Sequence, residues 1–86
     1  MKAVVISRYG GPEVLEVRDV PEPSLQPGEE LVRVQSGGLN FADTMSTMGR
    51  YPGLPRPPFV AGREFCGSRA SDGRLVMGYS QWGAFA

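Results

Sequence analysis

The pattern of apolar and polar positions predicts short strands separated by turns rich in glycine and proline. Lys2–Ser7 is rich in valine and isoleucine and stops at residues 9–12, Tyr-Gly-Gly-Pro, which have strong turn chemistry. Val14–Val20 alternates apolar and polar side chains, imperfectly, as is typical of a strand leaving a turn. We therefore expect the two strands to pair as a hairpin.

The following residues predict a loop and a third strand. Prolines interrupt regular structure between residues 21 and 28, because proline lacks the N–H donor and fixes its own φ. Leu31–Gln35 then has the apolar spacing of a strand, and the Ser-Gly-Gly segment at 36–38 is expected to end it.

One short helix is predicted after this strand. Asn40 can cap a helix over Phe41–Met48, and Asp43, three residues later, resembles the acid of a capping box. Gly49 can stop the helix. We expect about two turns.

The last third of the chain predicts a stiff loop, two more strands and an apolar tail. Four prolines fall within Tyr51–Pro58, which forbids a helix and favours a partly extended connection of the kind that often borders a cleft. Phe59–Cys66 is expected to begin one strand and Leu75–Tyr79 to form another, before the tail at Trp82–Ala86. These elements predict a single, mainly β domain over residues 1–86, most simply a small barrel.

Length and charge then exclude several classes of protein. The 86 residues hold one compact domain, and nine basic and nine acidic residues cancel without forming a run of one sign. The longest purely apolar run, Ala3–Ile6, is far below the ~20 residues of a membrane-spanning helix, and no signal-peptide pattern precedes it. We expect a cytoplasmic protein with no nucleic-acid and no membrane partner.

An absence in the composition restricts the chemistry further. The chain has no histidine, and Cys66 is its only cysteine. A Ser-His-Asp triad, a Cys-His pair, an intrachain disulfide and a zinc site built from Cys and His ligands are therefore excluded. No metal site is expected. A glycine-rich phosphate loop followed by a helix is missing as well.

Five segments of the chain follow one another in an order that is informative as a set. They are MKAVVISRYGGPEVLEVRDVPEP, PGEELVRVQSGGLNFADTM, GRYPG, FVAGREFCG and GRLVMGYSQWGAFA. Together they resemble the N-terminal GroES-like domain of the quinone oxidoreductase branch of the medium-chain dehydrogenase/reductase superfamily, over nearly the whole chain. The resemblance implies a truncated GroES-like, partly open β-barrel with one short helix, and the family's Rossmann domain is absent from these residues.

The resemblance also implies a reaction and a place for it. Members of this branch transfer a hydride from a reduced nicotinamide, NADPH or NADH, to a quinone or an activated alkene, and hold the nucleotide mainly in the Rossmann domain. The isolated 86-residue chain is therefore expected to be inactive. Asn40, Asp43 and Tyr51 match family positions near the nicotinamide ribose or the substrate.

Zinc is not expected on the same grounds. In zinc-dependent relatives the positions that match Asn40 and Arg63 are usually a cysteine and a histidine ligand, and neither is present here. The four-cysteine lobe that holds structural zinc is missing too. The resemblance therefore implies the zinc-free branch.

Each candidate residue also has an ordinary structural interpretation. Asn40 can be a plain helix cap, Asp43 a helix-start acid that favours the dipole, and Tyr51 a surface aromatic packed on proline. Arg63 is expected to be structural, and Cys66 to be a small buried apolar residue. Four apolar side chains can pack in a core or line a pocket for a flat quinone: Met45, Met48, Phe59 and Trp82.

The chain departs from the family pattern between its last two strands. The family usually carries another strand and an exposed loop there, whereas this chain has only Ser68–Asp72. An unpaired strand edge invites pairing with another chain. If the 86 residues are the whole molecule, we expect either a homo-oligomer formed through such an edge or partial disorder. The alternative to an enzyme is a stand-alone, non-catalytic β module that binds a partner or self-associates.

Overall fold

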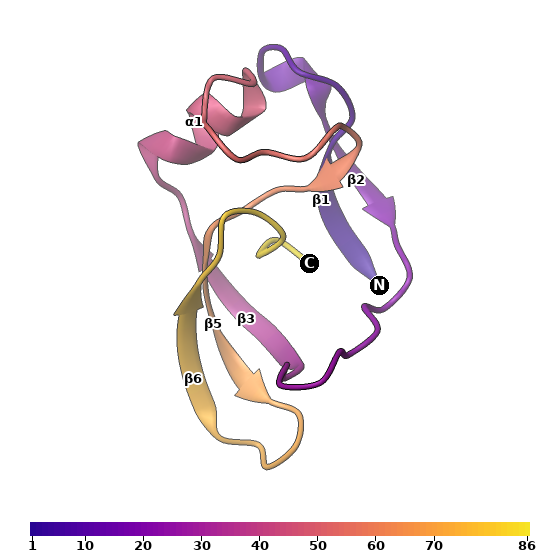
Figure 1. Ribbon diagram of the computed structural model, residues 1–86, viewed down its shortest axis with the longest axis vertical. Coiled ribbons are helices and arrows are strands. Elements are labelled where there is room, and N and C mark those ends of the chain that lie inside the picture. The colour runs from indigo at the N-terminus through magenta and orange to yellow at the C-terminus, as the bar shows by residue number, and fades with distance from the viewer.

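The computed structural model describes residues 1–86 and contains two three-stranded antiparallel sheets and one α-helix (Figure 1). The elements are β1 (Lys2–Ile6), the 3-10 turn η1 (Pro12–Val14), β2 (Leu15–Asp19), β3 (Val32–Gly38), α1 (Phe41–Thr47), β4 (Phe59–Val60), β5 (Glu64–Arg69) and β6 (Leu75–Tyr79). The strand orders are β2-β1-β4 and β3-β5-β6. The predicted mainly β, partly open architecture with one short helix is confirmed.

The first sheet begins with the predicted hairpin. β1 and β2 pair antiparallel, with Ile6 opposite Leu15. Their connection folds back on itself, because the Ser7 backbone N–H and hydroxyl both donate to the Val14 carbonyl, at 3.0 and 2.8 Å. Val14 is fully buried in the turn, so an apolar anchor holds the hairpin's end against the core.

The third strand is longer than predicted. The segment Ser36–Gly38 was expected to end it, yet β3 continues through these residues. Its last two glycines lie opposite Phe65 and Glu64 of β5, after a register shift between Val34 and Ser36. Pairing with a neighbouring strand therefore outweighs the weak intrinsic preference of glycine for a strand.

The prediction of one strand beginning over Phe59–Cys66 was wrong. These residues form two strands, β4 and β5, that belong to different sheets. Gly62 lies between them with φ +98°, a left-handed conformation that a strand cannot contain and that suits glycine. The link at residues 61–63 carries the chain from one sheet to the other.

The C-terminal tail lies between the two sheets (Figure 1). Val4 donates its backbone N–H to the Phe85 carbonyl at 2.9 Å, and Phe85 donates to the Ala61 carbonyl at 2.9 Å. The tail therefore adds main-chain pairing to the first sheet. The small core beneath it consists of Ile6, Val14, Phe59 and Ala61, with Val4, Leu54 and Phe85 packed against them.

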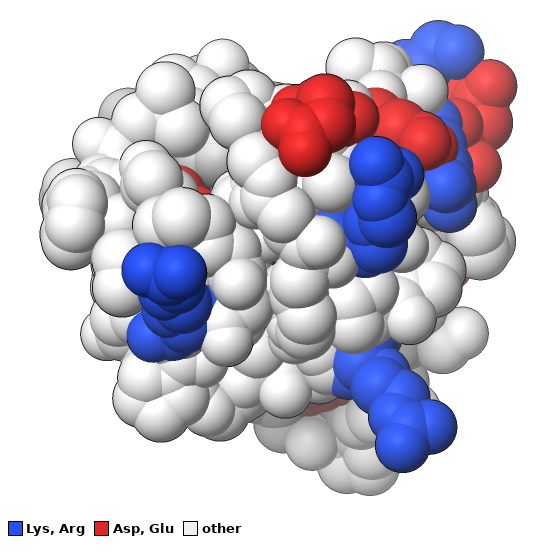
Figure 2. Space-filling view, turned by 90° about the horizontal axis from the view of Figure 1, so that it is seen from above, with Lys and Arg blue, Asp and Glu red and all other residues white.

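Charged side chains are spread over the surface in both signs. On the face seen in Figure 2, blue and red side chains occur singly or in mixed groups amid uncharged surface. The structure contains three ion pairs, and the partners in each are at least 30% exposed. Exposed pairs of this kind contribute about 0–1 kcal/mol each. No helix has the length and apolar character needed to cross a membrane.

The turn between β5 and β6 contains the acid with the most shifted pKa. The Asp72 carboxylate accepts hydrogen bonds from the Arg69 guanidinium and from the Arg74 backbone N–H. These bonds, above all the one from Arg69, lower the pKa of the carboxyl from 3.8 to about 2. Because the pKa is lower in the folded state, these hydrogen bonds stabilise the fold at any pH above the pKa of the unfolded chain. This stabilisation is lost as the pH falls through the pKa of the folded state.

We expect Asp72→Asn to be less stable than the wild type at neutral pH, with the difference shrinking between pH 3.8 and about 2. Urea unfolding at several pH values measures this difference, and an NMR titration of the Asp72 carboxyl reads the pKa directly. Titration near 3.8 would show that Arg69 does not hold this carboxylate in solution.

Candidate functional site

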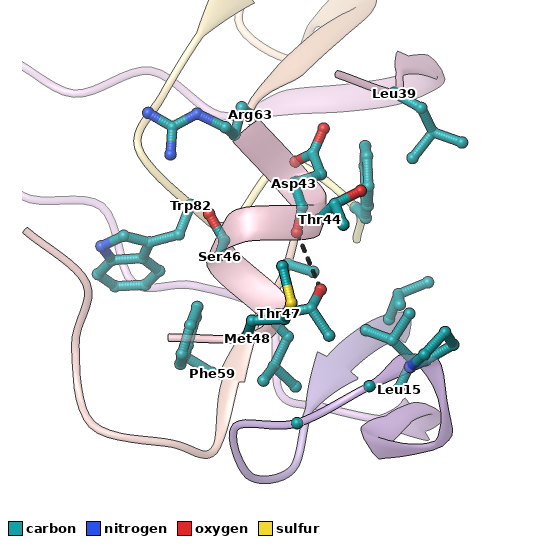
Figure 3. A pocket seen from close by; sticks show the side chains of 18 of the residues that line it. Leu15, Leu39, Asp43, Thr44, Ser46, Thr47, Met48, Phe59, Arg63 and Trp82 are labelled. Carbon is teal, nitrogen blue, oxygen red and sulfur yellow. Dashed lines mark hydrogen bonds between the residues drawn. The ribbon is translucent and has the colours of Figure 1, made fainter. Parts of the chain in front are cut away.

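An apolar cavity of about 340 Å³ lies beside α1 (Figure 3). Its walls come from β1 and the turn that follows, from α1, from the link between β4 and β5, and from the tail. Asp43 and Arg63 are the only charged residues in its lining. The tertiary structure thus brings one acid and one base to a mostly hydrophobic pocket.

Aromatic rings form part of the cavity and its surroundings. Phe59 packs edge-on against Trp82 with ring centroids 6.0 Å apart, and Tyr9 packs edge-on against Phe59 at 6.2 Å. Phe59, Trp82 and Met48 line the cavity, as the pocket interpretation of the sequence expects, whereas Met45 does not. Aromatic and thioether groups of this kind suit a flat apolar ligand.

Asn40 stands at the N-cap of α1, outside the cavity lining. Its backbone N–H donates to Asp43 Oδ2 at 2.8 Å, the bond that a capping-box acid makes. The Asn40 side-chain amide donates to Glu64 Oε2 at 3.3 Å. Asn40 therefore ties the start of the helix to β5 and fixes where Asp43 points.

The second carboxylate oxygen of Asp43 is free for another partner. Oδ1 is buried and accepts no hydrogen bond from the chain. The helix around it is held by Thr47 Oγ1, which donates to the Asp43 carbonyl at 2.9 Å (Figure 3). Leaving a buried acceptor unpaired costs about 1–3 kcal/mol. A ligand that brings a hydroxyl or amide donor to the cavity would remove that cost.

Arg63 is the most deeply buried charged residue, with only 2% of its surface exposed. Its Nη1 donates to the Gln81 carbonyl at 2.9 Å and its Nε to Tyr79 Oη at 3.1 Å, while its guanidinium lies 4.1 Å from the centroid of the Tyr51 ring. None of the three ion pairs includes Arg63. The cavity wall therefore holds a buried cation surrounded by neutral partners.

Tyr51 contacts a residue of the cavity lining, Arg63, but is not itself part of the lining. Its hydroxyl makes no hydrogen bond within the chain, although its ring stacks on the guanidinium. Of the three residues singled out in the sequence, Asp43 lines the cavity, Asn40 positions Asp43, and Tyr51 covers the Arg63 side chain.

Arg63 is the site residue whose position the sequence did not reveal. Its expected role was structural, and arginine is rarely buried without a carboxylate. Figure 3 shows its guanidinium pointing away from Asp43, on the side of Trp82. Arg63 directly follows Gly62, which has φ +98°.

The donors that commonly bind metals are not gathered in this structure. No three His, Cys, Asp or Glu side chains come close enough together to hold an ion. Cys66 is a free thiol in β5 and is half-buried, not fully buried as expected, because it lies on a sheet that is open to solvent on one face.

The chain is similar in sequence and structure to part of several longer proteins. No protein-family model matches it. The quinone oxidoreductase of Lama guanicoe is 34% identical over 82 residues, which is 94% of this chain and 25% of that protein. The quinone oxidoreductase of Thermus thermophilus, whose crystal structures include a complex with NADPH, superposes with a TM-score of 0.86 at 42% identity, over 98% of this chain and 27% of that one.

A human relative has a still higher structural similarity. The synaptic vesicle membrane protein VAT-1 homolog-like protein superposes with a TM-score of 0.92 at 32% identity, covering 99% of this chain and 30% of that one. The chain spans only 25% of the length of the curated Lama guanicoe relative. The likeness therefore concerns one part of each of these proteins.

Proposed function

Since the chain belongs, as a GroES-like domain, to the quinone oxidoreductase type of the medium-chain dehydrogenase/reductase superfamily, we propose that it forms the substrate wall of an NAD(P)H-dependent reductase. The substrate is a quinone or an activated alkene. The observation that carries the proposal is the apolar cavity of about 340 Å³ with Asp43 and Arg63 in its lining.

The cavity suits the substrate in shape and in charge. A flat ring can pack against Phe59, Trp82 and Met48, which supply apolar and polarisable surface. Reduction of a carbonyl conjugate places negative charge on its oxygen, and a buried cation stabilises such charge more than a solvated one does. Arg63 is the only cation in the lining, so we assign it this electrostatic role.

The residues that face the cavity also fit part of a nicotinamide cofactor. Reduced nicotinamide supplies the hydride when the cofactor is bound. Asp43 Oδ1, buried and without a donor, is suited to accept a hydrogen bond from a ribose hydroxyl, and Asn40 holds that carboxylate in place. Tyr51 lies outside the cavity lining, and its ring stacks on the Arg63 guanidinium, so we assign it an indirect role on the substrate side.

These residues hold only one side of the cofactor. The chain has no glycine-rich phosphate loop, so the phosphates require a nucleotide-binding domain outside residues 1–86, and the isolated chain is inactive. NADPH is favoured over NADH by the complex formed by the T. thermophilus relative. Zinc has no part in the proposal, because guanidinium and amide groups stand at Arg63 and Asn40, where the zinc-dependent relatives place ligands.

Trp82 provides the test, because it is the only tryptophan and it lines the cavity. We expect a simple quinone to quench its fluorescence saturably, since a bound ring would contact the indole. Thr44→Phe, an exposed position in the cavity lining, should weaken the quenching by filling the pocket, whereas Ser24→Phe on a distant loop should not. Quenching that rises linearly with quinone and is equal in both variants would mean collision without binding.

The same samples test the second half of the proposal. Wild-type chain mixed with NADPH and the quinone should show no sustained loss of nicotinamide absorbance. Sustained turnover by these residues alone would show that no further domain is needed.

A further inference from the structure

The outer edge of β6 is open and apolar. β6 pairs with β5 on one side only and ends its sheet. Its alternate residues Leu75, Met77 and Tyr79, here called the β6 edge residues, are 66%, 84% and 63% exposed. Large hydrophobic side chains at this exposure, side by side on one strand, are typical of a surface that meets another protein.

The main chain of the same residues also points outward. Arg69 donates its N–H to the Arg74 carbonyl at 2.8 Å, and Ser80 donates to the Arg63 carbonyl at 2.7 Å, so positions 74 and 80 face β5. Hydrogen-bonding direction alternates along an antiparallel strand, and positions 76 and 78 therefore face β5 as well. The N–H and C=O groups of the β6 edge residues are left to face the open side.

The other strand edges carry features that oppose pairing, and β6 does not. β2 contains Glu16, Arg18 and Asp19. β3 has a register shift within it, and β4 is only two residues long. β6 has no proline, no charged residue and an unbroken register with β5. Charge, bulges and short length are the usual protection of a sheet edge, so β6 is the unprotected edge of this fold.

We propose that a second copy of this chain pairs with β6, antiparallel and about a two-fold axis at Met77. Met77 then lies opposite Met77 of the second copy, and Leu75 lies opposite Tyr79 of the second copy. In this register the outward N–H and C=O groups exchange hydrogen bonds along the whole strand, and the two β3-β5-β6 sheets become one.

Charge and side-chain chemistry both fit this occupant. The register places Arg74 opposite Ser80 of the second copy, so no like charges meet, and the formal net charge of zero removes repulsion between copies. Aliphatic–aromatic pairs across the junction, such as Leu75 with Tyr79, favour strand pairing. The proposal rests on β6 alone and stands whether or not the cavity binds a quinone.

Sedimentation velocity over a range of concentrations tests the dimer. We expect the wild type to shift from monomer to dimer as concentration rises, and Met77→Lys to remain monomeric, because it places two ammonium groups face to face. Val17→Lys, at a residue 72% exposed on the β2 edge, is the matched control and should dimerise like the wild type. Circular dichroism checks that both variants are folded.

Two further measurements test the register. Met77→Glu should be monomeric alone and should form a dimer when mixed with Met77→Lys, since position 77 meets itself across the axis. Amide exchange at the β6 edge residues should slow as concentration rises, while positions 76 and 78 are protected throughout.

Any one of four results would overturn the proposal. The wild type could stay monomeric at every concentration, Met77→Lys could dimerise as well as the wild type, or the Glu and Lys variants could fail to associate. Edge amides protected equally at all concentrations would also overturn it, because a segment of the same chain would then cover β6.

Discussion

Gly62→Ala is expected to lower the free energy of unfolding by about 2–4 kcal/mol. Two effects combine at this position. Gly62 has φ +98°, a conformation that costs a residue with a side chain about 1–3 kcal/mol. An added Cβ would also overlap the Phe85 ring. Phe85 cannot move away easily, because its main chain is bonded on both sides, to Val4 and Ala61.

Gly83→Ala separates these two effects. Gly83 has φ +99°, yet nothing lies within 4 Å of the position its Cβ would take. The free energy of unfolding of Gly83→Ala should therefore fall only by the backbone cost. That of Gly62→Ala should fall further, by the cost of the overlap with Phe85. Urea unfolding followed by circular dichroism measures both. Equal losses in the two variants would show that the tail carrying Phe85 is not packed on Gly62 in solution.

Arg63→Ala is expected to destabilise the chain by about 3 kcal/mol, and more if the space does not close. The change truncates a long residue that is only 2% exposed, and it leaves a void. It also leaves the Gln81 carbonyl and Tyr79 Oη without their donor. Tyr79 and Gln81 are exposed, so water can replace the lost donor and the void accounts for most of the expected loss.

Arg33→Ala is the matched control for the loss of a guanidinium. Arg33 is exposed on β3 and its side chain makes no hydrogen bond or ion pair in the chain, so the effect should stay within about 0.5 kcal/mol. Arg63→Lys should fall between the two, since lysine keeps the charge but cannot form the planar fork or stack on Tyr51. Arg63→Ala as stable as Arg33→Ala would mean that Arg63 is not buried in solution.

Gly62 and Arg63 both lie in the link between β4 and β5, which connects the two sheets and lines the cavity. Gly62 allows the turn, and Arg63, directly after it, is only 2% exposed. A buried cation without a carboxylate partner gives little net stability compared with a well-packed apolar residue. In the function proposed above, the charge of Arg63 has an electrostatic role in the cavity wall.

Local signals predicted most elements correctly. The β1–β2 hairpin follows from an apolar run, a Gly-Gly-Pro turn and an alternating segment, all within about twenty residues of each other. The helix α1 likewise follows from Asn40, Asp43 and Gly49, and it ends within one residue of the predicted Met48. In both cases the interactions that decide the structure join residues close in sequence.

The errors occur where a distant strand decides the outcome. β3 continues through Gly37 and Gly38 because β5, more than twenty residues later, supplies their partners. Phe59–Cys66 forms two strands instead of one because its two ends pair with strands of different sheets. An apolar run cannot show which of several distant strands it will join, since that choice depends on packing of the whole chain.

The candidate site divides in the same way. Within these residues the inventory alone excludes histidine catalysis and an intrachain disulfide, and the cap pattern alone identifies Asn40 and Asp43. These features depend on composition or on neighbours three residues apart. Only the tertiary structure buries Arg63, leaves Asp43 Oδ1 without a donor and exposes Met77 on an open edge. Burial, unpaired polar atoms and free strand edges depend on contacts between segments far apart in sequence, and no local pattern contains them.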